Sequence, residues 1–337
     1  MSTPVIAFFN NKGGVGKTSL VYHVAWMLAD QGFRVVAADL DPQGNLSAAF
    51  LNESRLEQLW PENQHPSTIF GAIRPLKTGV GDVQDPLLES ICEDLVLIPG
   101  DMALSQFEDD LSQVWPKCLD GDERAFRVIS AFWRVLQRGA TNHFADVVLV
   151  DLGPNLGAVN RAALIASDYV VIPLGPDLFS LQGLRNLGPT LREWREGWEQ
   201  RLARNPAKEL PLPQGTMEPL GYIVIQHSVR RDRPVMSYDK WIARIPATYR
   251  EFILDSPSDN NDSPLVADDP ECFALLKHYR SLMPMALEAR KPIFQLKSAD
   301  GAIGAHTYAV QDAYQDFKKL ALEIMSRACI TANTEIG

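Results

Sequence analysis

A stretch rich in glycine and lysine near the start of the chain has the residue types of a phosphate-binding loop. The segment FFNNKGGVGKTSLVYHV runs from Phe8 to Val24 and contains Gly16-Lys17-Thr18. In the phosphate loop G-x-x-x-x-G-K-[ST], backbone N–H groups surround the phosphates, the lysine reaches the β- and γ-phosphates, and the hydroxyl binds Mg²⁺. The sequence departs from this motif at two positions, because Asn11 replaces the first glycine and a second lysine, Lys12, follows it.

The residues around this loop predict the strand–loop–helix–strand context that a phosphate site requires. The apolar run Val5–Phe9 predicts a buried parallel strand that ends at the loop. Apolar residues then recur at helical spacing from Thr18 to Gly32, and Arg34–Asp39 predicts a second strand. This βαβ unit favours phosphate binding over a glycine-rich turn with a stray lysine. The predicted nucleotide-binding positions are Lys12, Gly13, Gly14, Val15, Gly16, Lys17, Thr18 and Ser19.

Three aspartates end or follow apolar strands on the side where phosphate and metal would lie. Asp151 follows the apolar run Val147–Val150 and is predicted, together with Thr18, to hold Mg²⁺, acting through metal-bound water. Asp39 and Asp41 are two residues apart on an extended segment, so their side chains are expected to point the same way. One aspartate at a strand end is often a loop cap, but three against a phosphate loop favour a metal-dependent site.

The rest of the chain predicts an α/β fold, with a doubly wound, mostly parallel twisted sheet and helices on both faces. Ligands of such folds bind at the carboxyl ends of the strands. Further strands are predicted at 95–98, 147–150, 169–172 and 222–225, and helices include 158–166 and 181–198.

We expect a single domain over residues 1–330, with insertions near 115–142 and 255–270 and a polar tail at 331–337. The first insertion places large apolar residues at helical spacing, which favours a core-covering helix over a partner site. The second is acidic and polar, so it is predicted to be a mobile surface excursion.

Three motifs carry a resemblance to a known family. Lys12–Thr18 (KGGVGKT) resembles the deviant Walker A loop of the ParA/MinD family of ATPases. Asp39–Asn45 (DLDPQGN) is similar to the ParA segment D-x-D-P-Q-G-N, and Val147–Pro154 (VVLVDLGP) resembles the Walker B strand. Asp168–Leu184 resembles the later strand and helix. The resemblance covers about residues 4–190, is faint in the C-terminal third, and favours the ParA branch over the MinD branch.

The resemblance implies an ATPase that uses ATP and Mg²⁺ and forms a homodimer with ATP bound. In the family, the lysine at the position of Lys12 contacts phosphate across the dimer interface, where it stabilises charge during phosphoryl transfer. Lys17 and Asp41 would be the other catalytic residues, with Asp41 orienting the attacking water and Asp39 supporting the metal shell. The family implies slow hydrolysis that a ParB-like partner stimulates, and positioning of DNA or another cargo in the cytoplasm, with association with the nucleoid as a further expectation.

Two further expectations concern the base and DNA. Gln226, at the end of a predicted strand, and Pro284, in a predicted proline-bearing loop, are candidates for contacts to adenine. A basic cluster is the candidate for binding DNA non-specifically, although a solvated charged loop explains it equally well: Arg230, Arg231, Arg233 and Lys240.

Composition limits the other functional classes. The 337-residue chain has a formal net charge of −10, which argues against a protein whose whole surface binds nucleic acid. Its four cysteines are scattered without a C-x-x-C pair, so iron–sulfur relatives find no support and a reducing cytoplasm fits best. The amphipathic tail segment 317–325 favours a last core helix over a membrane anchor. A small-molecule ligase on this fold would lack Lys12. The alternative that stays open is a regulatory ParA-like ATPase that acts through a protein partner without binding DNA.

Overall fold

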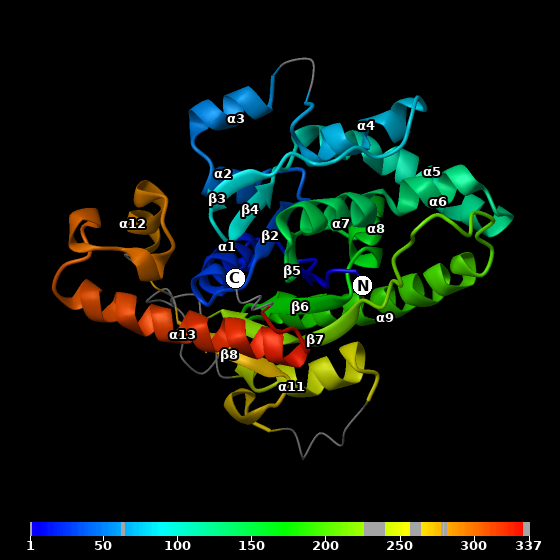
Figure 1. Ribbon diagram of the computed structural model, residues 1–337. Coiled ribbons are helices and arrows are strands. Elements are labelled where there is room, and N and C mark those ends of the chain that lie inside the picture. The colour runs from blue at the N-terminus through cyan, green and yellow to red at the C-terminus, as the bar shows by residue number, and fades with distance from the viewer. Residues whose placement is uncertain are drawn as a thin grey trace.

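The strands form one sheet that places all parallel carboxyl ends on the same edge. The computed structural model describes residues 2–61, 65–225, 240–256, 264–277, 279 and 282–332. Within this part of the chain the strand order is β3-β4-β2-β5-β1-β6-β7-β8, and only the β3–β4 pair is antiparallel (Figure 1). The strands are β1 (Val5–Phe8), β2 (Val35–Asp39), β3 (Glu89–Cys92), β4 (Leu95–Ile98), β5 (Val147–Asp151), β6 (Tyr169–Leu174), β7 (Glu218–Ile225) and β8 (Cys272–Leu276).

Helices cover both faces of this sheet. They are α1 (Lys17–Asp30), α2 (Asn45–Phe50), α3 (Glu53–Leu59), α4 (Ile69–Thr78), α5 (Glu108–Lys117), α6 (Glu123–Ile129), α7 (Ala131–His143), α8 (Ala158–Ile165), α9 (Leu178–Leu202), α11 (Ile245–Thr248), α12 (Leu282–Ala289) and α13 (Ala305–Arg327).

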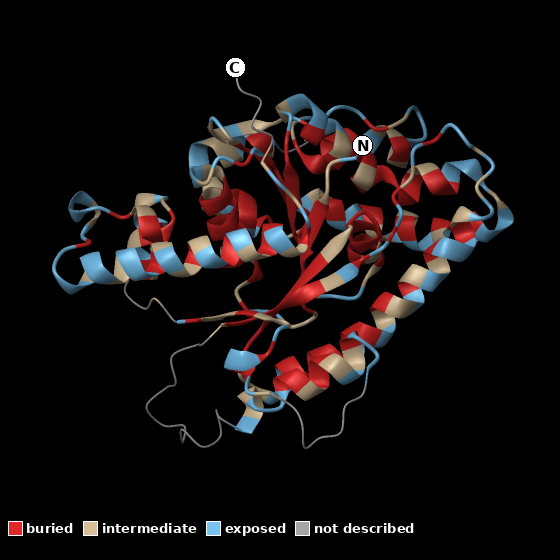
Figure 2. Ribbon diagram, turned by 60° about the horizontal axis from the view of Figure 1, so that its bottom comes forward, coloured by how far each residue is buried: buried red, intermediate tan, exposed pale blue. Residues whose placement is uncertain are grey.

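Alternation along β1 separates two apolar cores, because successive strand side chains point to opposite faces. Val5 and Ala7 pack with α4 to α9, whereas Ile6 and Phe8 pack with α1, α2, α12 and α13. Figure 2 shows the buried strands between helices whose outer sides are exposed. The predicted doubly wound α/β class is therefore confirmed.

Both edge strands lie outside the sequence prediction. Strand β3 has no fully buried residue, so it lacks the apolar run that identified the central strands. Strand β8 belongs to the C-terminal third, where it pairs with β7. Strand β7 also begins at Glu218 and includes Pro219, four residues earlier than the predicted strand.

The two predicted insertions have different structures. In the first, Phe126, Ile129, Phe132 and Leu136 of α6 and α7 are buried in the core, as expected of helices that cover the sheet. In the second, residues 257–263 lie outside the described residues. Of the residues that follow, Leu265, Ala267, Asp268 and Pro270 are exposed, as expected of a surface segment, whereas Val266 and Asp269 are buried and anchor it.

Asp269 anchors this segment to the sheet. Its carboxylate accepts hydrogen bonds from the Tyr222 hydroxyl of β7 at 2.6 Å and from Arg250 at 2.8 Å. A buried carboxylate needs such partners to offset its loss of hydration.

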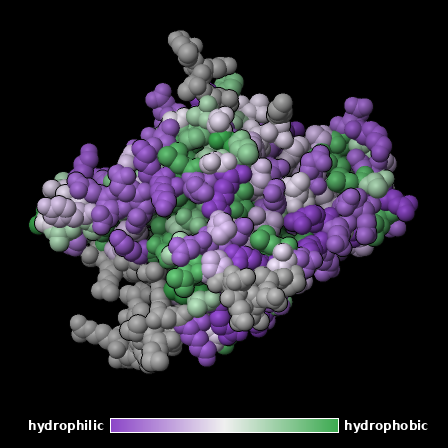
Figure 3. Space-filling view, turned by 90° about the horizontal axis from the view of Figure 1, so that it is seen from below, coloured by the Kyte–Doolittle hydropathy of each residue, from purple (hydrophilic) through white to green (hydrophobic). Residues whose placement is uncertain are grey.

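The C-terminal helix α13 packs one side against the sheet layer and α1. Its buried residues include Phe317, Leu320 and Ile324, the apolar positions of the segment 317–325. On the face seen from below, apolar side chains gather toward the middle and hydrophilic ones toward both ends (Figure 3). Among the described residues, no helix combines the length and apolar character needed to span a membrane.

Candidate nucleotide-binding site

The loop between β1 and α1 presents backbone donors at the carboxyl edge of the sheet. Gly14 and Gly16 have φ values of 72° and 80°, a conformation that glycine adopts without strain. A Cβ at position 16 would also lie 2.7 Å from Cδ1 of Ile225. Gly16 caps α1 without a side-chain hydrogen bond, and the first turn of this helix contains no acidic residue. The positive end of the helix dipole therefore faces the loop unopposed, which suits a phosphate.

Lys17 lies inside this loop. Its Nζ donates to the carbonyl oxygens of Asn10 and Lys12, both at 3.3 Å. Burial lowers the pKa of Lys17, whereas the nearby carboxylates of Asp151 and Asp41 act in the opposite direction. A phosphate placed against this ammonium would offset the cost of its burial.

Thr18 and Asp151 form the second part of the site. The Thr18 hydroxyl donates to Oδ2 of Asp151 at 2.6 Å, while Oδ1 is buried with no hydrogen-bond partner among the described residues. Burial, together with the charges of Asp39 and Asp41, raises the pKa of Asp151 to about 8, although the hydrogen bond from Thr18 acts against the shift. A buried carboxyl oxygen without a partner, next to a hydroxyl, fits a hard cation.

The described side chains do not by themselves enclose a metal ion. No group of three or more His, Cys, Asp or Glu side chains in this part of the chain is arranged to hold one. Mg²⁺ usually keeps several waters and takes one or two carboxylates together with substrate phosphates. The pair of Thr18 and Asp151 therefore fits Mg²⁺ delivered with a nucleotide better than a stand-alone metal centre.

Asp39 and Asp41 have different surroundings. Oδ2 of the fully buried Asp39 accepts hydrogen bonds from the backbone N–H of Ser47 at 2.8 Å and from its hydroxyl at 2.7 Å. Burial raises the pKa of Asp39 to about 6, although the Ser47 hydrogen bonds act against the shift. Asp41 is 6% exposed, and its Oδ1 accepts from the Gln43 N–H at 3.0 Å. Asp41 also lies beside Gly153, where a Cβ would be 3.2 Å from Oδ1.

The second lysine lies at the rim of the loop. The backbone N–H of Lys12 donates to Oδ1 of Asn10 at 3.0 Å, and its Nζ forms an ion pair with Asp177. Although burial acts the other way, the hydrogen bond from Lys12 lowers the pKa of Asp177. Asp177 also caps α9 by accepting from the Ser180 N–H at 2.9 Å. The side chain of Lys12 is 25% exposed, so the structure separates it from the buried Lys17.

Two apolar cavities lie beside the first turn of α1. One of about 140 Å³ is lined by Gly16, Ser19, Ile225 and Met283, among others, and one of about 240 Å³ also touches Ser19 and Met283. Pro284 lies in the first turn of α12 and is exposed, so the prediction of a proline-bearing loop is wrong. The neighbouring Met283 lines the cavities instead.

Gln226 and most of the predicted DNA-binding cluster lie outside the described residues: Arg230, Arg231 and Arg233. Lys240 is described and exposed, and its ammonium lies 5.3 Å from the ring centre of Trp241. Arg244 is exposed as well and lies 5.4 Å from the same ring. DNA binding by this region stays a prediction.

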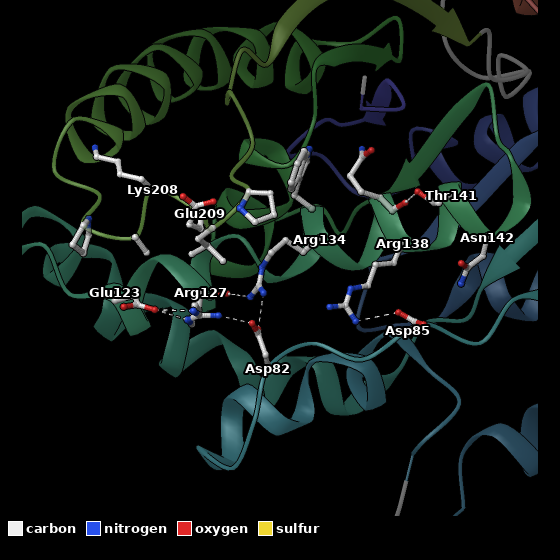
Figure 4. A pocket seen from close by; sticks show the side chains of 16 residues that line it. Asp82, Asp85, Glu123, Arg127, Arg134, Arg138, Thr141, Asn142, Lys208 and Glu209 are labelled. Atoms are coloured by element: carbon white, nitrogen blue, oxygen red, sulfur yellow. Dashed lines mark hydrogen bonds and ion pairs between the residues drawn. The ribbon is translucent and has the colours of Figure 1, made fainter.

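A larger cleft, of about 760 Å³, lies between α6, α7 and the segment 206–211, and no phosphate-loop residue lines it. Figure 4 shows Arg127 and Arg134 reaching the same carboxylate, Asp82, each at 2.6 Å. Trp133, the partly exposed member of the first insertion's helical pattern, lines this cleft. Because Arg127 of α6 and Arg134 of α7 both pair with Asp82, these charges join the elements that form the wall of the cleft.

Three residues of the site were not predicted from the sequence. Asp177 is separated from Lys12 by 165 residues, but the pattern Asp177-x-x-Ser180 before a helix is an N-cap signal that marks its position. Asn10 orients the loop by donating from Nδ2 to the Pro173 carbonyl at 2.7 Å. Ser47 binds Asp39, and no local pattern in the sequence indicates this contact.

Comparison with known proteins identifies the family. The profile of the AAA_31 family, described as an AAA domain, matches residues 3–203, which is more than half of the chain. The chain belongs to this family. Its relatives and its fold place it in the ParA/MinD family of P-loop ATPases. The family resemblance inferred from the sequence motifs is thus confirmed.

Individual relatives include partition proteins. Protein IncC of Escherichia coli is 30% identical over 200 residues, which make up 58% of this chain and 47% of IncC. Chromosome partitioning protein ParA of Caulobacter vibrioides is 31% identical over 198 residues, or 59% of this chain and 66% of that protein. The crystal structure of protein DIP2308 from Corynebacterium diphtheriae has the same fold, with a TM-score of 0.69 at 24% identity over 96% of this chain and 98% of the other. The chain thus spans about half to two thirds of the length of these two curated relatives.

Proposed function

We propose that this protein is an ATP-driven switch that dimerises when ATP is bound and hydrolyses ATP slowly to position or segregate DNA or another cellular cargo. The observation that carries the proposal is the different environment of the two lysines. Lys17 is buried and bonded to the carbonyl oxygens of its own loop, whereas Lys12 lies at the rim, paired with Asp177. Lys17 would therefore bind a phosphate held by its own chain, whereas Lys12 would reach a phosphate of a second chain after leaving Asp177.

The phosphates would lie on the backbone N–H groups of residues 13–18, with Lys17 beside them. Thr18 and Asp151 would hold Mg²⁺, and Asp39 would support the metal shell. When bound, the ion neutralises charge on the phosphate oxygens. Because the pKa of Asp151 is raised to about 8, its carboxyl would release a proton on binding the ion. Asp41, which lies beside Gly153, would orient the attacking water.

Dimerisation would use the rim of the loop. The ion pair between Lys12 and Asp177 joins two partly exposed groups, and such pairs contribute about 0–1 kcal/mol. A phosphate on a second copy of the chain can compete with so weak a partner. Leu178 and Phe179, which follow Asp177 directly, are 47% and 72% exposed. Apolar side chains beside the site support a surface that a second copy would cover.

The base would occupy the smaller apolar cavity, of about 140 Å³, which Gly16, Ile225 and Met283 help to line. Its mostly apolar walls suit a flat, weakly polar ring. The family resemblance further supports a ParB-like protein as the activator. The names of the partition relatives IncC and ParA support DNA as the cargo or the track.

The test is the mass of the Asp41→Ala protein, measured by light scattering with ATP·Mg²⁺, with ADP·Mg²⁺ and without nucleotide. Because this variant would bind ATP but not hydrolyse it, we expect a dimer with ATP only. Lys17→Ala, which removes the buried ammonium, is the matched control and should stay monomeric in all three conditions. A monomer with ATP for Asp41→Ala would overturn the proposal.

A second arm adds non-specific duplex DNA over a salt series. Binding of the dimer that weakens steeply with rising salt would support cargo positioning on DNA. A dimer that ignores DNA would keep the switch and favour the regulatory alternative, in which a protein partner reads the nucleotide state.

A further inference from the structure

Two loops meet around Asp39 at the carboxyl edge of the sheet. The first follows β2 and contains Asp41 and Gly44, and the second follows β4 and contains Gly100. They are joined by Ser47, whose hydroxyl donates to Asp39 at 2.7 Å and accepts from the Gly100 N–H at 2.8 Å. A Cβ on Gly100 would lie 2.7 Å from Cγ of Asp39, so the second loop packs directly on this carboxylate.

Trp60 links these two loops from the outside. It follows the last residue of α3, and its indole Nε1 donates to the Gly100 carbonyl at 2.9 Å. The far edge of the same ring covers Gly44, where a Cβ would lie 3.1 Å from Cζ2 of Trp60. One half-buried side chain therefore binds one loop by a hydrogen bond and the other by packing.

The covered glycine determines where Asp41 lies. Gly44 has a φ of 66° and caps α2, and its N–H donates to the Asp41 carbonyl at 2.9 Å. The contacts thus form a closed ring that runs from Trp60 to Gly100, through Ser47 to Asp39, and back through Asp41 and Gly44. Without the indole this ring is open on its solvent side.

We propose that Trp60 is a positioning residue that clamps the segment 39–47 and so holds Asp41 in place for the reaction. The catalytic part of this inference rests on the proposed function, whereas the clamp itself rests on the contacts above. The effect should be local, because the indole binds Gly100 and covers Gly44, both outside the phosphate loop.

The clamp is tested by hydrogen–deuterium exchange of peptides that cover residues 40–50, in the full chain without nucleotide. We expect Trp60→Leu, which removes both contacts, to speed exchange there about tenfold through local opening. Trp60→Phe loses the hydrogen bond and the far ring edge that reaches Gly44, but keeps an aromatic ring in the half-buried position, so it should give a smaller increase of about threefold. Trp133→Leu removes a partly buried tryptophan from the distant cleft and should leave this segment unchanged.

Exchange rates in residues 40–50 that are equal in the wild type and in both Trp60 variants would overturn the clamp. If Trp60→Leu fails to fold, Trp60→Phe decides by the same measurement.

The catalytic part is tested by steady-state ATP hydrolysis. We expect Trp60→Leu to lower kcat about tenfold while KM for ATP·Mg²⁺ changes less than about twofold, since a displaced Asp41 affects the reaction more than binding. A rise in KM with unchanged kcat would overturn the positioning role. If the wild type hydrolyses no ATP, the proposed function fails, and the exchange measurement still decides whether Trp60 clamps the segment.

Discussion

Replacing Asp151 by asparagine should stabilise the protein in the absence of nucleotide while removing its response to Mg²⁺. Asparagine has nearly the same shape, and its side-chain oxygen can still accept the hydrogen bond from the Thr18 hydroxyl. It carries no charge, however, so the cost of burying a carboxylate without a cation disappears. A residue kept for binding at a cost in stability is expected at a functional site.

The size of the effect follows from the raised pKa. The pKa of the Asp151 carboxyl is raised from 3.8 to about 8 by burial and by the neighbouring aspartates. Between these two values the folded state holds a proton that the unfolded state has lost, so stability falls as pH rises. From pH 3.8 to 7 this is about 3 units at 1.36 kcal/mol each, or about 4 kcal/mol. For a chain of 337 residues, with about 2.1 cal/mol/K of unfolding entropy per residue, the variant should melt about 6 °C higher at pH 7.

Thermal unfolding of the wild type and of Asp151→Asn between pH 5 and 8, in EDTA, measures this difference. The slope from Asp39, whose pKa is raised to about 6, is present in both proteins and cancels in the comparison. Asp120→Asn, at an exposed aspartate, controls for the loss of one carboxylate. Parallel stability curves for the wild type and the variant would refute the reasoning. ATP·Mg²⁺ should stabilise the wild type more at pH 8 than at pH 6, whereas its effect on the variant, which keeps the phosphate loop and Lys17, should be the same at both pH values.

Three other outcomes follow from the geometry. Lys12→Ala should still bind ATP but lose partner-stimulated hydrolysis by about 10³-fold, and unchanged stimulated turnover would contradict the role of this lysine. Gly16→Ala, with a φ of 80° and a Cβ 2.7 Å from Ile225, should lower the free energy of unfolding in urea by about 1–3 kcal/mol. Gly14→Ala, with nothing within 4 Å, should cost less. Burial lowers the pKa of His23 from 6.5 to about 4, so the contribution of His23 to stability should fall by about 3 kcal/mol as pH drops from 6.5 to 4, against the opposite slopes of Asp39 and Asp151. His23→Gln should lack this contribution, so the difference in unfolding free energy between the variant and the wild type, measured in urea at each pH, should change by about 3 kcal/mol between pH 6.5 and 4.

The parts of the site that could be predicted are those whose chemistry is encoded locally. The phosphate loop lies within eight consecutive residues, and Asp39 and Asp151 directly end apolar strands, so sequence spacing alone locates them. The central strands could be predicted equally well, because both of their faces are buried and their sequences are therefore uninterrupted apolar runs.

What could not be predicted depends on contacts between distant segments. The packing of Trp60 over Gly44 and the pairing of Lys12 with Asp177 leave no pattern in the neighbouring residues. Pro284 was misplaced for a related reason, since a proline is compatible with both a loop and the first turn of a helix. The buried Asp269 likewise lies in a segment whose overall polarity indicated exposure.

Helix α9 connects the rim of the phosphate loop to the distant cleft. It begins next to Asp177, the partner of Lys12, and its 25 residues extend about 37 Å to Leu202, shortly before the segment 206–211 that forms a wall of the distant cleft (Figure 1). A tilt of about 5° at the phosphate-loop end would move the other end by about 3 Å over this length. The separation of Lys12 from Asp177 would then move residues far from the nucleotide. A fluorophore attached at position 208, in the wall of the cleft, should report this movement as a change in its emission.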